Sequence, residues 1–305
     1  MLRIVFMGTP DFSVPILEAL INKYEVIGVV TQPDKKVGRK QEIVASPVKE
    51  CALRHHISVF QPTKIRTEYE DIVALNPDLI VTAAYGQIVG MKLLNAPKYR
   101  SINVHASLLP KYRGGAPIHE AIKQGEAETG VTIMYMEKGM DSGDILAQRK
   151  IPIEESDTSG TMFNKLSILG RDLLMEVIPD LIDGKITPIK QDESQVTFAY
   201  NITKEEEKLD FTKSSRQIFN HIRAYNPFPT AYMELGDEII KVYDSKVSDE
   251  VHNTKPGEIL KTTKHGFLVA CGEGTTLEIL EVQPSGKRRM KASDYANGAL
   301  RKYLK

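Results

Sequence analysis

SINVHASLLPKYRGG, residues Ser101–Gly115, passes from a buried-strand pattern to an apolar tight bend and then to a glycine-rich basic turn. Its first part predicts a strand. Because successive strand side chains point to opposite faces, Asn103 and His105 would share one face while Val104 takes the other. An amide and an imidazole would therefore lie together at the C-terminal end of a strand, which is the edge where ligands bind in open α/β sheets.

This pair has two interpretations. The Asn103 amide offers two N–H donors, and the His105 ring can donate, accept or carry a proton, which suits a site where an oxyanion forms and an amine reacts. A polar pair at a strand end can also be purely structural, with its hydrogen bonds satisfied inside the fold. The residues that follow favour the first interpretation.

The beginning of the chain predicts an α/β fold. Arg3–Met7 reads as a strand, Asp11–Lys23 as a helix and Glu25–Thr31 as a β-branched strand covered on both faces. Further strand and helix patterns alternate as far as residue 84, so we expect a doubly wound, mostly parallel sheet. The turn at Gly8-Thr9-Pro10 lacks the G-x-G-x-x-G pattern, which argues against a dinucleotide site.

Between residues 32 and 45 lies a polar segment without periodicity, which is long for a connection inside a compact domain. It would leave the C-terminal end of a strand, on the ligand side of the sheet. A solvated loop is one interpretation and contact with an anionic partner is the other. Its basic residues are Lys35, Lys36, Arg39 and Lys40.

A glycine-bounded turn, Lys138–Asp144, follows a predicted strand at Gly130–Glu137. Its two carboxylates, Asp141 and Asp144, can be ordinary turn formers. One of them can also lie over the same strand-end crevice as His105, where a carboxylate would orient the ring.

The composition limits the class of protein. The chain has 305 residues, with 40 basic and 40 acidic side chains, so any anionic partner must bind to local patches. The two cysteines predict no disulfide framework, and no apolar run has the length of a signal peptide or a membrane span. We expect a soluble, cytoplasmic protein.

The last third of the chain loses the alternation of strands and helices. Residues 184–208 are polar and read as a linker, so the predicted domains are 1–183 and 209–305. A helix at Ser215–Ala224 precedes several short strands, which suggests a small barrel. From Pro284 onward basic residues predominate, including Lys287, Arg288, Arg289 and Lys291, and they favour contact with phosphates.

Seven short motifs, in order over about 140 residues, resemble the methionyl-tRNA formyltransferases. The Asn-x-His and Asp motifs recur in the wider family that transfers formyl groups from 10-formyltetrahydrofolate. The motifs are Gly8-Thr9-Pro10-Asp11-Phe12, Thr31-Gln32-Pro33-Asp34, Ala84-Tyr85-Gly86, Asn103-x-His105-x-Ser107-Leu108-Leu109-Pro110, Arg113-Gly114-Gly115-Ala116-Pro117-Ile118, Glu128-Thr129-Gly130-Val131-Thr132 and Met140-Asp141-Ser142-Gly143-Asp144.

The resemblance implies a Rossmann-like catalytic domain followed by an OB-like, tRNA-binding barrel. It also implies formyl transfer to the amino group of charged initiator methionyl-tRNA, with 10-formyltetrahydrofolate as co-substrate and no metal. Asn103 and His105 would donate to the developing oxyanion, and Asp141 would hold His105 and help to move the amine's proton. The folate pocket would be formed by Gln87, Ile88, Ser107, Leu108, Leu109 and Pro110.

The resemblance further implies that the basic loop and the basic C-terminal segment contact the tRNA, with Arg39 as the main residue. Gln41 and Glu42 stand where the family's loop often has more lysines. Two alternatives remain open: formylation of a nucleotide-linked amino sugar or other small amine, and a non-catalytic RNA-binding module on a degenerate Rossmann-like domain. The intact Asn103, His105 and Asp141 argue against the second. We expect a monomer without a membrane partner.

Overall fold

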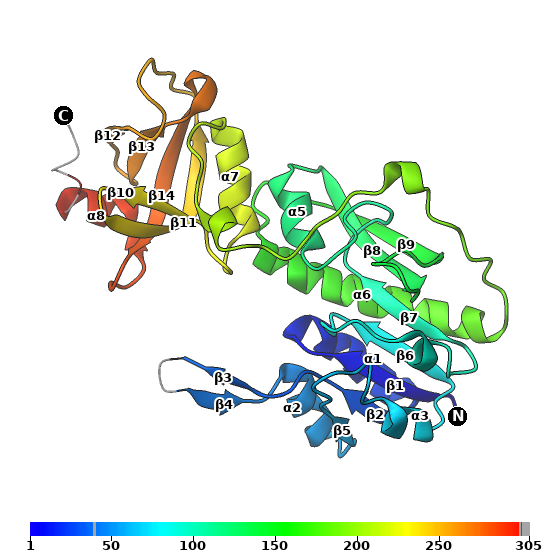
Figure 1. Cartoon of the computed structure of the whole chain (residues 1–305). Helices are drawn as coiled ribbons and strands as arrows, with labels where there is room; N and C mark the ends of the chain where they lie inside the picture. The colour runs from blue at the N-terminus through cyan, green and yellow to red at the C-terminus, as the bar shows by residue number, and fades with distance from the viewer. Residues whose placement is uncertain (39–40, 299, 301–305) are drawn as a thin grey trace. The chain divides into compact units, whose positions relative to one another are not determined.

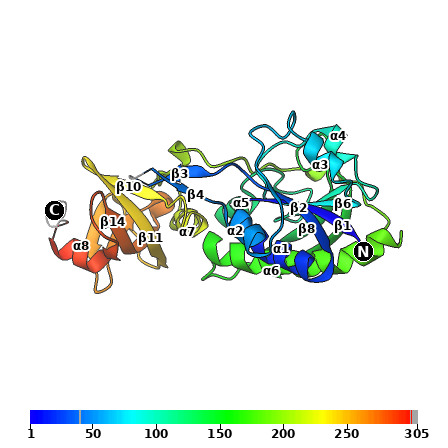
Figure 2. The same cartoon turned by 90° about the horizontal axis from the view of Figure 1, so that it is seen from below.

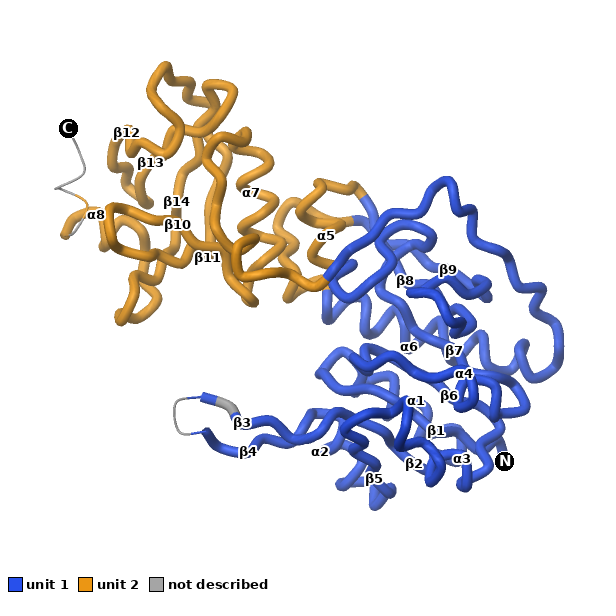
Figure 3. Tube along the Cα trace, in the orientation of Figure 1, with its two compact units in different colours: residues 1–117, 128–152, 163–200 blue, residues 118–127, 153–162, 201–305 orange. Residues whose placement is uncertain are grey.

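The computed structural model describes residues 1–38, 41–298 and 300, and the side chain of Val37 is not described (Figure 1). Contacts between Cα atoms divide the chain into two compact units (Figure 3). Unit 1 consists of residues 1–117, 128–152 and 163–200, and unit 2 of residues 118–127, 153–162 and 201–305. Within the described residues, no helix is both long and apolar enough to cross a membrane.

Unit 1 contains a seven-stranded sheet in the order β5-β2-β1-β6-β7-β8-β9. The strands from β5 to β7 are parallel, and β8 and β9 extend the sheet with antiparallel pairing. The chain order reverses direction across the sheet between β1 and β6, so the predicted doubly wound, mostly parallel sheet is confirmed. The strands are β1 (Arg3–Gly8), β2 (Glu25–Val30), β5 (Val59–Phe60), β6 (Leu79–Ala83), β7 (Ser101–His105), β8 (Glu128–Tyr135) and β9 (Ile145–Pro152).

Helices cover both faces of this sheet, with α1 and α6 on one side and α3 and α4 on the other (Figure 2). Gly170 of α6 packs closely against Val104 of β7, because a Cβ on Gly170 would lie 2.7 Å from a methyl group of Val104. The helices of the first 182 residues are η1 (Asp11–Ser13), α1 (Val14–Lys23), α2 (Pro47–Arg54), α3 (Glu70–Ala74), α4 (Met91–Leu94), α5 (Pro117–Lys123) and α6 (Ser159–Ile182).

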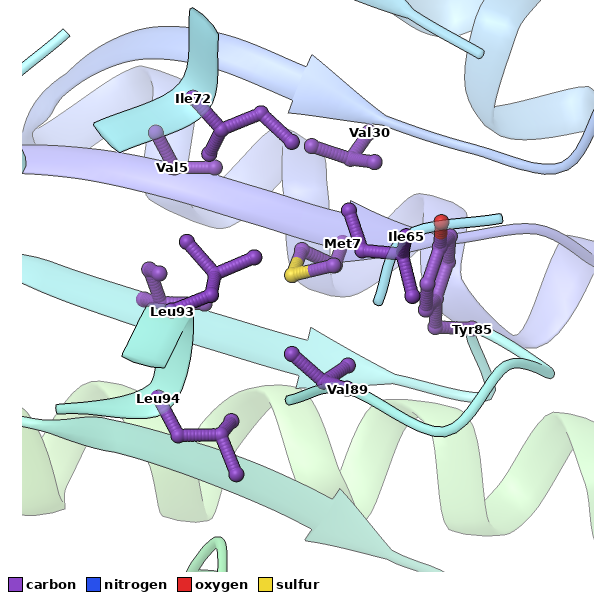
Figure 4. Packing of buried hydrophobic residues seen from close by; sticks show 10 residues of the cluster. Val5, Met7, Val30, Ile65, Ile72, Tyr85, Val89, Leu93 and Leu94 are labelled. Carbon is purple, nitrogen blue, oxygen red and sulfur yellow. The ribbon is translucent and has the colours of Figure 1, made fainter. Parts of the chain in front are cut away.

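The face that carries α3 and α4 buries a continuous apolar core (Figure 4). Val5 and Met7 of β1 pack there with Ile72 of α3 and with Leu93 of α4. Tyr85, two residues after the end of β6, closes this core at the C-terminal end of the strands, and burial raises the pKa of its phenol to about 12. The core therefore ends where the strand-end loops begin.

The predicted polar loop at residues 32–45 is in part a hairpin. Its strands are β3 (Lys35–Val37) and β4 (Glu42–Val44), which pair antiparallel and project from the body of unit 1 (Figure 1). Ile43 and Val44 have β-branched side chains that favour a strand even though both are exposed. The expectation of a loop without regular structure was therefore wrong for these residues.

Unit 2 contains a curled antiparallel sheet in the order β10-β11-β14-β13-β12, with β15 paired to β14. This arrangement is consistent with the predicted OB-like barrel. Its elements are η3 (Glu205–Glu207), α7 (Ser215–Ala224), β10 (Tyr232–Leu235), β11 (Glu238–Ser248), β12 (Ile259–Thr262), β13 (Phe267–Ala270), η4 (Gly272–Gly274), β14 (Thr276–Pro284), β15 (Met290–Lys291) and α8 (Ala292–Gly298).

The segment after α6 contributes backbone pairing to unit 1. Ile189 forms a bridge with Ile145, and Phe198 forms one with Arg113. Between these bridges lies the short helix η2 (Glu193–Gln195). Residues that the sequence placed in a linker are thus hydrogen-bonded to the body of unit 1.

Candidate active site

Asn103 lies on β7, directly opposite Thr82 of the neighbouring strand β6. Thr82 of β6 donates from Oγ1 to Asn103 Oδ1 at 2.7 Å. This bond fixes the amide, and within the described residues no hydrogen bond engages Nδ2. The N–H donors of Asn103 are therefore the part of the amide that can meet a ligand.

His105, the last residue of β7, is 5% exposed. Its Nε2 lies 3.0 Å from the backbone carbonyl of Tyr112. Because a carbonyl only accepts, Nε2 carries the proton in this contact, and in the neutral ring Nδ1 holds the lone pair. The atom of His105 that can take up or return a proton is therefore Nδ1.

Asp141 faces this nitrogen from the turn between β8 and β9. Its Oδ2 lies 3.7 Å from His105 Nδ1 and accepts a hydrogen bond from the backbone N–H of Gly114 at 2.9 Å. A separation of 3.7 Å is too long for a direct hydrogen bond but short enough for a strong interaction with a cationic ring. The Asp141 carboxylate is therefore placed to stabilise a His105 ring that carries a proton on Nδ1.

Glycines allow the loops to approach at this point. Gly114 has a φ of +123°, and a Cβ there would lie 2.5 Å from the carbonyl oxygen of Ala199. A Cβ on Gly143 would lie 1.9 Å from the carbonyl oxygen of Tyr135. Both positions exclude a larger side chain, so the Gly114 amide can reach the Asp141 carboxylate.

The bend after β7 is braced by buried polar groups. Thr132 of β8 donates from Oγ1 to the Ser107 carbonyl at 2.7 Å and accepts from the Leu109 amide at 3.1 Å. Gln148 of β9 donates from Nε2 to the Leu109 carbonyl at 2.8 Å. Side-chain hydrogen bonds thus tie this bend to β9 and to β8, the strand that pairs with β7.

One cluster in the described part of the chain has metal-ligating residue types. Ligand atoms of Glu18, Cys51 and His55 lie within 4.8 Å of one another. Burial, reinforced by Glu18, raises the pKa of the Cys51 thiol, which opposes the thiolate that binds a metal. The Glu18 carboxylate also pairs with Arg54, so this cluster gives little support for a metal site.

Two family models match this chain. A formyl transferase model covers residues 2–178, and a model of the formyl transferase C-terminal domain covers residues 201–300. The chain belongs to the formyl transferase family. The motifs that resembled this family in the sequence all lie within the first match.

Full-length relatives of this formyl transferase carry a more specific name. A methionyl-tRNA formyltransferase of Bacillus cytotoxicus is 52% identical over 98% of this chain and 96% of its own length. The methionyl-tRNA formyltransferase of Lactiplantibacillus plantarum is 55% identical over 99% of this chain and 97% of its own length.

Solved structures share the fold at lower identity. The N-formyltransferase of Helicobacter canadensis, in complex with folinic acid and dTDP-3-aminofucose, has a TM-score of 0.71 and 22% identity, and the match covers 92% of this chain and 99% of that one. HypX of Aquifex aeolicus, in complex with tetrahydrofolic acid, has a TM-score of 0.68 and 15% identity, and the match covers 99% of this chain and 48% of that one. At these identities the likeness establishes the fold alone.

The residues predicted to form the folate pocket of this formyl transferase have different surroundings. Ile88 is 72% exposed, and Leu108 and Pro110 are partly exposed. Leu109 is buried against Met134 and Ile145.

Two of the predicted folate residues have their side chains engaged in the fold. Ser107 Oγ donates to the Lys111 carbonyl at 2.7 Å. Gln87 accepts from the Ile65 amide at 3.0 Å and donates to the Pro62 carbonyl at 3.1 Å. Ser107, Leu109 and Gln87 can therefore shape a pocket mainly through the backbone they hold.

The predicted tRNA residues are distributed over two regions. Lys35 and Lys36 are exposed on β3, and Arg39 and Lys40 lie outside the described residues. Lys287, Arg288, Arg289 and Lys291 are exposed around the β14–β15 turn. Arg289 is already engaged, because its guanidinium pairs with Glu281 and lies 4.2 Å from the centre of the Tyr243 ring.

Sequence reasoning missed three residues that surround the site: Thr82, Arg113 and Gln191. Arg113 was quoted only as part of a motif, and Gln191 lies in the polar stretch assigned to a linker. Arg113 donates to Gln191, and Gln191 donates to two backbone carbonyls of the Asp141 turn. The sequence offered one indication of this role: Arg113 is a charged residue between the apolar bend and two glycines.

Proposed function

We propose that this chain transfers the formyl group of 10-formyltetrahydrofolate to the amino group of charged initiator methionyl-tRNA. The observation that carries this proposal is the full-length similarity, at 52% and 55% identity, to two methionyl-tRNA formyltransferases. The site supports it, because a free amide donor, a histidine and a carboxylate meet at one strand end.

The reaction requires three events at this site. The neutral amine attacks the formyl carbon, the carbonyl oxygen becomes an oxyanion, and the bond from carbon to the folate nitrogen breaks as that nitrogen takes up a proton. In balance, one proton leaves the amine and one reaches the folate nitrogen. A donor for the oxyanion and a carrier for the proton are therefore needed.

Asn103 is the proposed oxyanion donor, since Thr82 fixes its carbonyl and leaves Nδ2 available. His105 carries the proton on Nδ1, because the Tyr112 carbonyl keeps the proton on Nε2. Once protonated at Nδ1, the ring can also donate to the oxyanion. Asp141 stabilises that cationic ring from 3.7 Å and is near enough to share the amine's proton through a bridging group.

The donor pocket is proposed to lie along the bend after β7 and the loop after β6. Its residues are Gln87, Ile88, Ser107, Leu108, Leu109 and Pro110. The exposed Ile88 and the partly exposed Leu108 offer apolar surface to a flat ring, while the other members hold backbone groups in place. The bound folates of the H. canadensis and A. aeolicus proteins support a folate donor for this fold.

The tRNA surface is proposed to include the β3–β4 hairpin with Arg39 and the β14–β15 turn of a C-terminal domain at residues 209–305. The exposed Lys35 and Lys36 of β3 and the exposed basic residues of the β14–β15 turn would contact phosphates. By resemblance, Arg39, which lies outside the described residues, remains the main tRNA-binding residue of the segment between β3 and β4. The net charge of zero makes such local patches necessary.

A comparison of acceptors tests the proposal. Purified chain is incubated with 10-formyltetrahydrofolate and with charged initiator tRNA, free methionine or a nucleotide-linked amino sugar, and formyl incorporation is measured. We expect kcat/KM for methionyl-tRNA to exceed the other values by several orders of magnitude, because binding energy from the remote tRNA body lowers the transition state. A preference for the amino sugar would replace this proposal with the small-amine alternative.

A further inference from the structure

We propose that Gln191, oriented by Arg113, is a positioning residue for Asp141, and this inference rests on the proposed function. Gln191 lies between α6 and η2, in a stretch without periodicity. Its side chain connects two loops that are far apart in sequence, because Arg113 is 78 residues away and Asp141 is 50 residues away.

Every polar atom of the Gln191 amide has a partner. Its Nε2 donates to the carbonyl of Asp141 at 2.7 Å and to the carbonyl of Gly143 at 2.8 Å. Its Oε1 accepts from Arg113 Nε at 3.0 Å and from a terminal guanidinium nitrogen of Arg113 at 2.8 Å. The bonds to Arg113 fix which end of the amide is the donor, so Nε2 must face the Asp141 turn.

Arg113 is well placed to hold this amide. It is 4% exposed, and two further N–H groups of its guanidinium donate to the carboxylate of Glu193, which holds the pKa of that carboxyl below its usual range. Removing a partner from a buried guanidinium costs free energy. The bonds from Arg113 therefore favour one orientation of the Gln191 amide. The residue after Arg113, Gly114, donates its backbone N–H to the Asp141 side chain.

Asp141 needs such support. Its φ is +45°, in the left-handed region, where a residue other than glycine is disfavoured and must be held by its surroundings. The Arg113–Gln191 pair holds the Asp141 backbone, and Gly114 holds its carboxylate. Together they set the 3.7 Å separation between Asp141 Oδ2 and His105 Nδ1.

Gln191→Glu isolates the donor function of this amide. The carboxylate keeps the length of the side chain and can still accept from Arg113, but it places an oxygen against the carbonyls of Asp141 and Gly143. The matched control is Gln195→Glu, which adds the same charge in the same segment. The native Gln195 side chain is exposed, and among the described residues it donates to Asp192 alone.

The kinetic test measures formyl transfer to methionyl-tRNA. We expect Gln191→Glu to lower kcat on the order of 10²-fold, as for a small misplacement of a reacting group, and to leave KM for 10-formyltetrahydrofolate near its wild-type value. Gln195→Glu should behave as wild type. In an Asp141→Asn background, Gln191→Glu should cause no further loss, because the two changes remove one function.

Hydrogen exchange of the Gly114 amide gives a second measurement that needs no substrate. Gln191→Glu should speed this exchange, while the amides of β8 keep their protection. The inference would be overturned if Gln191→Glu kept the wild-type kcat and the wild-type exchange rate of the Gly114 amide. It would also be overturned if Gln191→Glu lowered kcat by the same factor in the wild type and in the Asp141→Asn background. If the wild type formylated no methionyl-tRNA, the proposed function would fail, and faster or unchanged Gly114 exchange would still decide the role of Gln191.

Discussion

Asn103 shows how a neighbouring residue can give one side chain its role. The Thr82 hydroxyl donates a hydrogen bond to the side-chain carbonyl of Asn103, so the amide N–H groups of Asn103 remain for a ligand. His105 is arranged in the same manner, since the Tyr112 carbonyl occupies Nε2 and leaves Nδ1 toward Asp141. At the scale of single residues, the site is built from polar groups whose other atoms are already satisfied.

The two carboxylates of the turn between β8 and β9 should differ in importance. Asp141→Asn removes the charge beside His105 Nδ1, so we expect kcat to fall by about 10²-fold or more, in the range of lost acid–base assistance. Asp144→Asn is the control, because within the described residues its side chain has no recorded hydrogen bond or ion pair. If both variants fold and lose kcat equally, the two carboxylates serve only to form the turn, and Asp141 has no separate catalytic role.

At the scale of elements, buried periodic segments were predictable and long-range polar contacts were not. The strand that carries Asn103 and His105 follows from its alternation, and the structure has it as β7. The role of Gln191 depends on partners that no local pattern reveals. Helix α8 was missed because it is short, although Ala292, Tyr295 and Ala296 are buried at helical spacing.

Helix α7 carries a histidine that should make the stability of the protein depend on pH. Burial, with the nearby Lys123 ammonium, lowers the pKa of His221 to about 4. Glu206 and Lys213 are the other charged groups that act on the ring, and Tyr225 packs against it at 4.5 Å between ring centres. The folded state therefore holds this histidine neutral at a pH where the unfolded chain already binds a proton.

The sign follows from proton binding. Between pH 6.5 and about 4 the unfolded state binds more protons at His221, so the free energy of unfolding should fall as the pH is lowered, on the order of 3 kcal/mol from this group. Urea denaturation of wild type and His221→Gln across this range measures the effect. The variant should lose less stability than wild type, and His265→Gln, at an exposed position, should not differ from wild type.

At the scale of the whole molecule, tRNA binding should depend on salt through the basic residues that are not already paired. Within the described residues, Lys287 and Arg288 have no recorded ion pair, whereas Arg289 pairs with Glu281. Replacing both Lys287 and Arg288 by alanine should reduce the slope of log affinity against log salt by about 0.7–0.9 per lost phosphate contact. Arg289→Ala should change this slope less, and a salt series of tRNA affinities compares the three proteins.

The folate donor provides the control for that experiment. Its affinity should be the same in all three proteins, because the proposed donor pocket lies among the loops after β6 and β7 of unit 1. If the double variant keeps the wild-type tRNA affinity and salt slope, Lys287 and Arg288 are solvated side chains that do not contact the tRNA. A folate affinity that falls together with tRNA affinity would point to a general effect on folding.

Single-turnover formyl transfer to methionyl-tRNA in wild type and Asn103→Ala tests the proposed chemistry most directly. With both substrates saturating, we predict that the rate constant falls by about 10²–10³-fold, the usual cost of one lost oxyanion donor. The thermal stability and the affinities for both substrates should remain near those of wild type. A folded variant that transfers the formyl group at the wild-type rate would contradict the oxyanion role of Asn103.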